Sequence, residues 1–440
     1  MIAYDDAPFA GFHLRVCAAS TAGVFADGFG LGIIGIALSL AAPRLQLTPL
    51  WLGSLGGASL AGLFAGALLT GPVADQFGRR AIFVSNMILA GALSALQFLA
   101  GSAPLLLLLR LAIGFLLGTD YVVSKALLTE FIPRRYRGRI LGQLSIAWAG
   151  GYACAYAVGV ALTPYGADSW RWMLLSSAAP CLLIVPLRMT IPESPMWLVG
   201  HGQYERAAQI VRSRIGREVR PPLPPAVARS PAGRWQRLLS APWRTRTLVA
   251  CTFFACQVVP YFALGTFVTQ VMAALHLQGG HLGGLIYNVS LLLGAIIGVL
   301  LVDRLSRRAF LIGSFVLAAV ALLLLSALSQ LHAVTMILLF ALFAGVISAA
   351  SNLVYVYLPE LFPTELRASG IGLAVAASRI GSAASTFVLP MIMVAFGART
   401  ALGACVAVLT LGALVCYRWA PETRNLALEA LDRSVADRSR

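Results

Sequence analysis

Apolar residues recur along the chain in twelve runs of roughly 20 residues, separated by short polar segments. A helical run of that length crosses the hydrocarbon core of a bilayer, which is roughly 30 Å thick. The pattern therefore predicts an all-α integral membrane protein with twelve transmembrane helices. The runs lie at residues 16–42, 50–74, 81–100, 104–129, 139–163, 170–190, 248–273, 281–302, 309–330, 334–357, 369–396 and 399–419.

Three polar segments between these runs occur twice, about 230 residues apart. Residues 75–80 return as 303–308, residues 130–137 as 360–367, and the Pro-Glu pair at 192–193 as 421–422. A common offset indicates two homologous halves, which we expect to form two pseudo-symmetric six-helix bundles around a central cavity. The predicted units are a first bundle (1–191), a central loop (192–247), a second bundle (248–420) and a tail (421–440).

The charge distribution gives the predicted bundle an orientation. The net charge is +16, and 27 of the 33 Lys and Arg residues fall on one predicted side of the membrane, Arg188 among them. Basic loops stay on the cytoplasmic side, so both termini and the central loop are expected there. We predict a multi-pass protein of a bacterial cytoplasmic (inner) membrane, acting as a monomer. This segregation excludes nucleic-acid binding as the reason for the positive charge.

The central loop contains one segment with helical periodicity. Within Gln203–Ile215, apolar residues recur among charged ones, which predicts an amphipathic helix on the cytoplasmic face. The Pro-rich stretch Pro221–Pro225 that follows is typical of a linker.

The repeated segments resemble the signatures of the major facilitator superfamily. Asp75–Arg80 resembles the loop signature after the second span, and Pro192–Leu198 resembles the sugar-porter signature after the sixth. Tyr357–Arg367 is similar to the niacin and organic-ion branch, and Thr119–Ser124 to metabolite:proton symporters. The resemblance implies a secondary transporter of a small metabolite, with no cofactor and no bound metal.

Repeated charges at one end of both bundles are candidates for a gate. Charges on the two halves can pair when that end closes and separate when it opens. The alternative is that they only fix the topology, and Ser306, where the family usually has Gly, suggests a less tight second loop. The gate candidates are Asp75, Gly78, Arg79, Arg80, Glu130, Arg137 and Glu193 in the first half, and Asp303, Arg307, Arg308, Glu360, Arg367 and Glu422 in the second.

Five charged residues lie more than two residues inside the ends of the predicted spans and have no counterpart in the other half. They are Asp27, Arg110, Asp120, Lys125 and Arg379. A charge at the centre of a spanning helix costs roughly 2.5–3.5 kcal/mol on insertion scales, so each needs a partner or a cavity. Gating is thus duplicated in the sequence, whereas the intramembrane charges are specific to single spans.

The family resemblance implies a proton site between an acid of the first span and Arg110 of the fourth. A second acid common in relatives is replaced by Gly30, and Asp27 lies three residues earlier. Asp27 or Asp120 is expected to carry the proton, because burial raises a carboxylate pKa toward neutrality. The alternative is a permanently ionised Asp27–Arg110 pair.

Arg379 is the main indication of substrate charge. No acidic residue lies elsewhere in its span, so an anionic group of a substrate would pair well with its guanidinium. The alternative is an ion pair with Asp120 or Asp27 across the cavity. Further candidates for lining the substrate site, or for helix-packing hydrogen bonds, are Lys125, Gln257, Tyr261, Gln270, Asn288, Asn352 and Tyr355.

The combined prediction is a proton symporter that takes up a small organic anion by alternating access. Alternatives are a porter of sugars or neutral metabolites, an efflux antiporter of the same fold, and a transporter-like sensor. The sequence contains no recognisable nucleophile–base pair, metal cluster or phosphate-binding loop, so an enzyme is not expected. Residues 139–162 also lack the proline found in the fifth span of drug antiporters.

Overall fold

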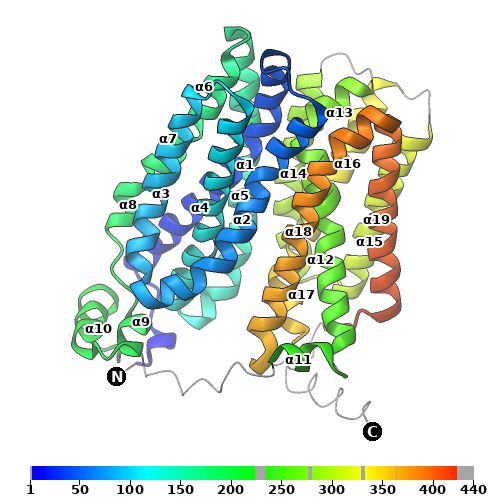
Figure 1. The fold of residues 1–440 in the computed structure, drawn as a ribbon. Coiled ribbons are helices and arrows are strands. Elements are labelled where there is room, and N and C mark those ends of the chain that lie inside the picture. The colour runs from blue at the N-terminus through cyan, green and yellow to red at the C-terminus, as the bar shows by residue number, and fades with distance from the viewer. Residues whose placement is uncertain are drawn as a thin grey trace.

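The computed structural model describes residues 2–222, 234–241, 243–275, 280–328, 332–362 and 364–423. In these residues twelve helices are long and apolar enough to cross a membrane. The described chain forms no strand beyond an isolated bridge between Ile2 and Val219. The predicted all-α fold with twelve transmembrane helices is confirmed. Figure 1 shows the helices as two bundles side by side.

The first half contains five continuous spanning helices and one interrupted span. The sixth span breaks into three short helices because Pro180 and Pro186 lack the N–H that a continuous helix needs. The elements are α1 (Gly11–Arg44), α2 (Pro49–Phe77), α3 (Arg79–Leu96), α4 (Ala103–Phe131), α5 (Arg134–Leu162), α6 (Ser169–Ser176), α7 (Ala178–Leu183) and α8 (Val185–Met189).

The second half repeats this order with two interrupted spans. The seventh span is divided at Phe267 and the tenth at Ser351–Asn352. The elements are α12 (Arg244–Thr266), α13 (Val268–Ala274), α14 (Gly280–Val302), α15 (Arg307–Ala327), α16 (Ala333–Ala350), α17 (Leu353–Glu360), α18 (Thr364–Phe396) and α19 (Ala398–Trp419).

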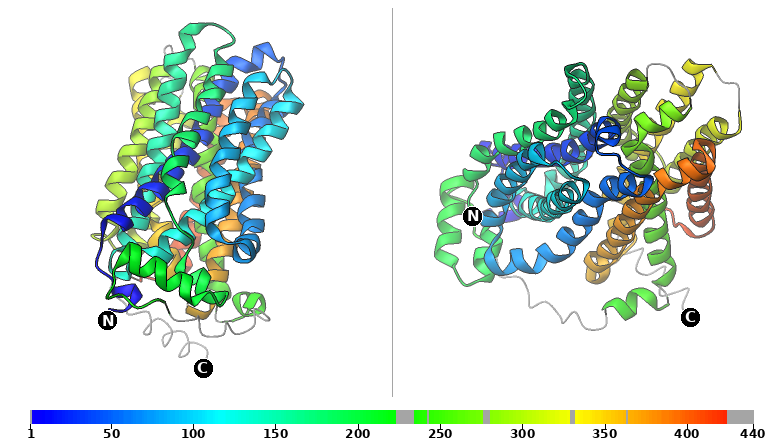
Figure 2. Two further views of the ribbon diagram at one scale, coloured as in Figure 1. Left: turned by 90° about the vertical axis from the view of Figure 1, so that its left-hand side faces the viewer. Right: turned by 45° about the horizontal axis from the view of Figure 1, so that its top comes forward.

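The helix packing is pseudo-symmetric. In the first half α1 packs on α5 and α2 on α4, and in the second half α12 packs on α18 and α14 on α16. Between the halves α2 packs on α18, and the equivalent pair α5 and α14 packs on the other side. The right-hand view in Figure 2 shows the same two bundles. A cavity on the pseudo-twofold axis is therefore walled by helices of both halves.

The ends of the bundle differ in charge. We call the end that carries Arg79, Arg80, Arg307 and Arg308 the basic end, and the other the opposite end. At the opposite end, Gly53 packs against the carbonyl oxygen of Phe387, and Gly35 against that of Thr266. A Cβ atom on either glycine would lie 2.0 Å from that oxygen. Only glycine allows such backbone contact, so the two halves close tightly at the opposite end.

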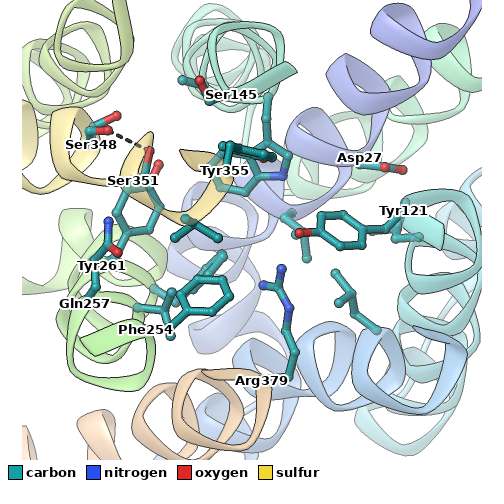
Figure 3. A pocket seen from close by; sticks show the side chains of 18 residues that line it. Asp27, Tyr121, Ser145, Phe254, Gln257, Tyr261, Ser348, Ser351, Tyr355 and Arg379 are labelled. Carbon is teal, nitrogen blue, oxygen red and sulfur yellow. Dashed lines mark hydrogen bonds between the residues drawn. The ribbon is translucent and has the colours of Figure 1, made fainter. Parts of the chain in front are cut away.

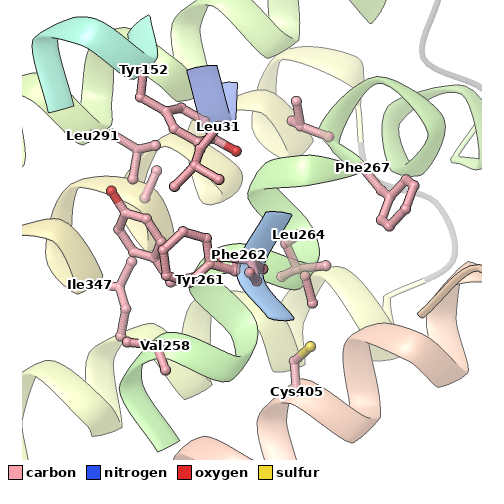
Figure 4. Packing of buried hydrophobic residues seen from close by; sticks show 14 of the residues in the cluster. Leu31, Tyr152, Val258, Tyr261, Phe262, Leu264, Phe267, Leu291, Ile347 and Cys405 are labelled. Atoms are coloured by element: carbon pink, nitrogen blue, oxygen red, sulfur yellow. The ribbon is translucent and has the colours of Figure 1, made fainter. Parts of the chain in front are cut away.

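Apolar packing continues across the contact between the halves. Leu31 and Tyr152 of the first half belong to the same buried cluster as Tyr261, Phe262 and Ile347 of the second. Figure 4 shows these side chains gathered around α12. Leu31, Tyr261 and Phe262 of this cluster also line the pocket between the halves.

The central segment forms a short helical layer at the basic end. It comprises α9 (Pro195–Gly200), α10 (Tyr204–Ile210), the π-helical turn η4 (Val211–Ile215) and α11 (Arg234–Leu239). The helix found at 204–215 buries Ala207, Val211 and Ile215, as its amphipathic pattern suggests. Most of the Pro-rich stretch and the tail beyond residue 423 lie outside the described residues.

Candidate functional site

A pocket lies between the two halves near the middle of the spans. Asp27 is the single carboxylate among its lining side chains, and Arg379 the single cation. Figure 3 shows Arg379, Tyr121 and Tyr355 pointing toward its centre. The lining comprises Asp27, Leu31, Leu63, Leu117, Tyr121, Ser145, Trp148 and Ala149 of the first half, and Phe254, Gln257, Val258, Tyr261, Phe262, Ser348, Ser351, Val354, Tyr355 and Arg379 of the second.

Aromatic rings from both halves meet in this pocket. The ring of Trp148 lies 5.8 Å from those of Tyr261 and Phe262, measured between centroids. Tyr261 and Phe262 in turn contact each other edge to face at 5.3 Å. Rings at these distances and angles attract one another and offer flat apolar surface to a ligand.

Two cations surround Tyr121. The Lys125 ammonium lies 3.3 Å from the centroid of the Tyr121 ring and 4.9 Å from that of Tyr355. The Arg379 guanidinium lies 5.4 Å from the Tyr121 centroid. Neither cation has an ion-pair partner among the described residues. The expected alternative, a pair of Arg379 with Asp120 or Asp27, is therefore not present in this structure.

Asp120 is instead paired with Arg188. Arg188 Nη1 lies 2.5 Å from Asp120 Oδ1, Nη2 lies 3.0 Å from Oδ2, and both side chains are fully buried. Counting Arg188 among the charges beyond the span was wrong. Its Nη1 also donates to the Phe83 carbonyl at 2.8 Å, and its guanidinium lies over the Phe83 ring. The pair is thus built into the first half.

Asp27 lies beside this pair. Gly23, one helical turn before it on α1, packs so closely that a Cβ would lie 1.8 Å from Arg188 Nη2 and 2.9 Å from Asp120 Oδ2. Asp27 itself is 4% exposed, and its Oδ1 has no hydrogen-bond partner. Among the described residues Asp27 forms no ion pair, although it lies next to the Asp120–Arg188 pair.

Arg110 does not pair with Asp27. Its Nη1 and Nη2 donate to the Gly30 carbonyl at 3.1 and 3.2 Å, and its Nε has no partner. The alternative of a structural Asp27–Arg110 ion pair is not realised in this state. Gly30 follows Asp27 by three residues on α1, so the two groups lie about one helical turn apart along that helix.

The predicted polar residues of the pocket divide into two groups. Gln257, Tyr261 and Tyr355 line the pocket. Asn288 donates to the Gly284 carbonyl of its own helix at 2.7 Å and does not line the pocket. Asn352 joins the halves, because its Oδ1 accepts from the Ser145 hydroxyl at 2.7 Å. Gln270 donates to the Gly35 carbonyl, also across the halves.

The gate charges of the first half form a local network. Arg79 Nη2 lies 3.3 Å from Asp75 and 3.0 Å from Glu130. The Glu193 carboxylate accepts from the main-chain N–H groups of Arg79 and Arg80 at 3.0 and 3.1 Å. Gly78 adopts a φ of +91°, and a Cβ there would lie 2.5 Å from Glu193. Glycine is required for both reasons.

The second half repeats the network with small differences. Arg307 contacts Asp303 at 3.5 Å and Glu360 at 3.7 Å, and Glu422 accepts from main-chain N–H groups of Arg307 and Arg308. Ser306 has a φ of −59° and caps α15 by accepting from the Ala309 N–H, so this loop turns without glycine. Burial raises the pKa of Glu360 above its ordinary value, although the Thr423 hydroxyl and Arg307 oppose this.

The pairs between gate charges stay within one half. Among the described residues no ion pair joins the two halves at the basic end. The remaining candidates make other contacts. Arg137 pairs with Asp5 of the N-terminal turn η1 (Tyr4–Asp6) at 3.0 Å, and Arg367 donates to the Pro359 carbonyl. The expected pairing across the halves is thus absent from this state.

Sequence reasoning missed several residues of the site. Tyr121 precedes Lys125 by four residues on the same helix face, so its contact with Lys125 was within reach of the pattern. Trp148, Phe254 and Phe262 gave no comparable signal, because an aromatic residue in an apolar span equally well contacts lipid or a neighbouring helix. The role of Arg188 had no local signal either.

The sequence profile of the family described as "Sugar (and other) transporter" matches residues 16–434. This chain belongs to that family. It is therefore a major facilitator superfamily transporter rather than an enzyme.

The similar proteins agree with this assignment. The inner membrane metabolite transport protein YgcS of Escherichia coli is 39% identical over 97% of this chain and 95% of its own length. The putative metabolite transport protein YaaU of the same organism is 34% identical over 97% and 96%. The partially occluded inward-open structure of the E. coli xylose transporter XylE superposes with a TM-score of 0.80 at 20% identity, covering 95% of this chain and all of that one.

Proposed function

We propose that this transporter is a proton symporter that takes up a small organic anion. The observation that carries the proposal is Arg379, the cation that lines the pocket, with Lys125 next to it against the Tyr121 ring; neither has a carboxylate partner in the described chain. A buried charge without compensation is costly, and an anionic substrate would supply that compensation. Arg379 also offers the planar, two-pronged geometry that suits a carboxylate or phosphate.

The rest of the pocket suits an organic body attached to that anion. Trp148, Phe254 and Phe262 present flat apolar faces, while Gln257 has a buried Oε1 without a hydrogen-bond partner. Ligand pockets commonly combine mostly apolar walls with a few polar groups that fix orientation. Gln257 is the group we assign to a hydroxyl or amide donor of the substrate.

Asp27 is our choice for the proton carrier. Asp120 is held by Arg188, so its charge is already balanced inside the first half. Asp27 reaches the pocket and has a free Oδ1. Arg110 of α4 contacts α1 at Gly30, about one helical turn beyond Asp27. In another conformation it can become the partner of ionised Asp27. Protonation of Asp27 would then be coupled to the switch between states.

We place the basic end, with both termini, in the cytoplasm, following the excess of basic residues in its loops. The backbone contacts at Gly53 and Gly35 close the opposite end, while the charges at the basic end pair only within each half. These features support a state that is closed to the outside and competent to open to the cytoplasm. The gate charges would pair across the halves in the other state.

A porter of neutral sugars is the main alternative, since the family description includes sugars and hydroxyl groups of Ser348 and Ser351 line the pocket. A ligand panel separates the two. The melting temperature of the purified protein should rise with small carboxylates or phosphate esters, because a ligand that binds only the folded state stabilises it. Neutral sugars should leave it unchanged. A rise with a neutral sugar and none with any anion would contradict the proposal.

The direction of transport is tested in proteoliposomes. An inward proton gradient should drive accumulation of the anion that stabilises the protein, and a protonophore should abolish it. Accumulation of the anion inside the vesicles that is driven only by an outward-directed proton gradient would favour the efflux antiporter. Binding without any movement of substrate would favour a sensor.

A further inference from the structure

A second hollow lies on the outside of the first half, at the basic end. It is an open groove between α3, the end of α8 and the central segment. Its lining combines two arginines with apolar side chains and one tryptophan, at the level where the helices end. The lining residues are Phe77, Arg80, Ala81, Val84, Ser85, Ile88, Met189, Glu193, Trp197, Leu198, Gln203 and Arg206.

The guanidinium groups of both arginines in this groove donate hydrogen bonds to neutral oxygens. Arg80 Nη2 donates to the Met189 carbonyl at 3.3 Å, and Arg206 Nη1 donates to the Gln203 side chain at 2.8 Å. Neither has an ion-pair partner in the described chain. Glu193, the single acid of the groove, accepts from three main-chain N–H groups. Two guanidinium groups therefore remain available to an anion.

The groove continues onto the apolar outer face of α3. Val84 and Ile88 follow Arg80 by four and eight residues, which places Ile88 about 12 Å farther into the membrane span. Ile88 is 44% exposed and the adjacent Leu89 52% exposed. Trp197 lines the polar part, and tryptophan prefers the boundary between headgroups and hydrocarbon. The groove thus has a cationic end and an apolar end aligned along the spanning direction.

We propose that this groove binds an acidic phospholipid of the leaflet at the basic end. Its phosphate-bearing headgroup would contact Arg80 and Arg206, and one acyl chain would lie along Val84 and Ile88. A soluble phosphate compound would use only the cationic end and leave the apolar half in contact with bulk lipid. The wall formed by α9 and α10 has no equivalent in the described part of the second half, although Arg308 there donates to the Tyr417 carbonyl much as Arg80 does to that of Met189.

The test compares lipid retention by the purified full-length protein in native mass spectrometry. Phosphatidylglycerol and phosphatidylcholine with identical acyl chains are the probes. The wild type should retain phosphatidylglycerol preferentially, and Arg206→Gln should weaken that retention about tenfold through loss of one charge-assisted contact. Arg214→Gln changes the charge equally on η4, outside the groove, and should retain the lipid as the wild type does.

Two further experiments distinguish a bound phospholipid from a bound soluble phosphate ester. Ser85→Trp fills the apolar half and should reduce retention while the protein elutes as a single species. Glycerol 3-phosphate at millimolar concentration should not displace the lipid. Equal retention of both lipids, or equal effects of Arg206→Gln and Arg214→Gln, would overturn the proposal. Full displacement by glycerol 3-phosphate would assign the groove to a soluble phosphate ester instead.

Discussion

Arg188 of α8 holds Asp120 of α4 in a bidentate ion pair, and both side chains are fully buried. The two residues come from spans that are separated by 68 positions in the chain. Separating a buried ion pair is costly, because each partner would then be an uncompensated charge in a low-dielectric interior. The pair therefore acts as a neutral structural unit, and Asp27 remains the carboxylate that we propose as the proton carrier.

The first prediction concerns coupling. Asp27→Asn should abolish accumulation of substrate against its gradient, because the residue can no longer alternate between charged and neutral forms. Counterflow exchange should persist, since it requires no net proton movement. Uptake into proteoliposomes measures both. Asp27→Glu keeps a titrating group and should retain part of the accumulation, and wild-type accumulation by Asp27→Asn would exclude Asp27 as the carrier.

The second prediction concerns the Arg188–Asp120 pair. Asp120→Asn or Arg188→Met alone should destabilise the protein by about 3–5 kcal/mol, because each leaves a buried charge unpaired. The double variant Asp120→Asn/Arg188→Met should recover most of the loss in thermal stability, as well as coupled transport. A double variant that is stable but has lost proton-driven accumulation would show that Asp120 itself takes part in coupling.

The third prediction concerns Arg379. Arg379→Lys keeps the charge but loses the two-pronged geometry, and should weaken substrate binding by about 1–3 kcal/mol. Arg379→Ala should abolish specific binding, with the protein still folded and inserted. Arg418→Ala, on the outer helix α19, is the matched control. Normal binding of a neutral or cationic substrate by Arg379→Ala would refute the anion assignment.

The fourth prediction uses the closed opposite end. A side chain at Gly53 would collide with the Phe387 carbonyl, so Gly53→Val should disfavour the state described by this structure. A cysteine placed at Ala149 in the pocket, in a background without the seven native cysteines, should then react faster with an impermeant thiol reagent added from the opposite side. Gly71→Val has open space around it and should not change that rate.

The fifth prediction concerns pH and Glu360. Burial raises the pKa of the Glu360 carboxyl in the folded protein. As the pH rises above the ordinary glutamate pKa of about 4.3, ionisation of this carboxyl therefore lowers the stability of the folded state. Glu360→Gln mimics the protonated form. Its gain in melting temperature over the wild type should be larger at pH 7.5 than at pH 4.5. A gain that is equal at both pH values, or larger at the lower one, would contradict the shift, and Glu205→Gln on α10 is the charge-matched control.

Hydropathy alone determined the spans, because each must be long and apolar enough to cross the bilayer whatever its neighbours are. The duplicated polar segments likewise implied two related halves, and the observed packing of α2 on α18 and of α5 on α14 follows that symmetry. The five intramembrane charges were also visible, since a charge is rare where its burial is expensive.

The tertiary structure decided which of the charged residues form ion pairs with each other. Arg188 lies at the end of its span, four residues before Pro192, so its position suits both a loop charge and a buried one. Only the packing of α8 against α1 and α3 turns it inward to Asp120. Likewise Arg137 pairs with Asp5 because the N-terminal turn folds back on α5, a contact between residues 132 positions apart.

The conformational state is a second property that the sequence alone leaves open. One sequence must support at least two arrangements of the halves to transport by alternating access. The repeated charges are compatible with both, whereas the backbone contacts of Gly35 and Gly53 exist in the arrangement seen here. The sequence thus determined the spans, the two related halves and the charges they contain, and the three-dimensional packing decided which charges are neutralised and which face the pocket.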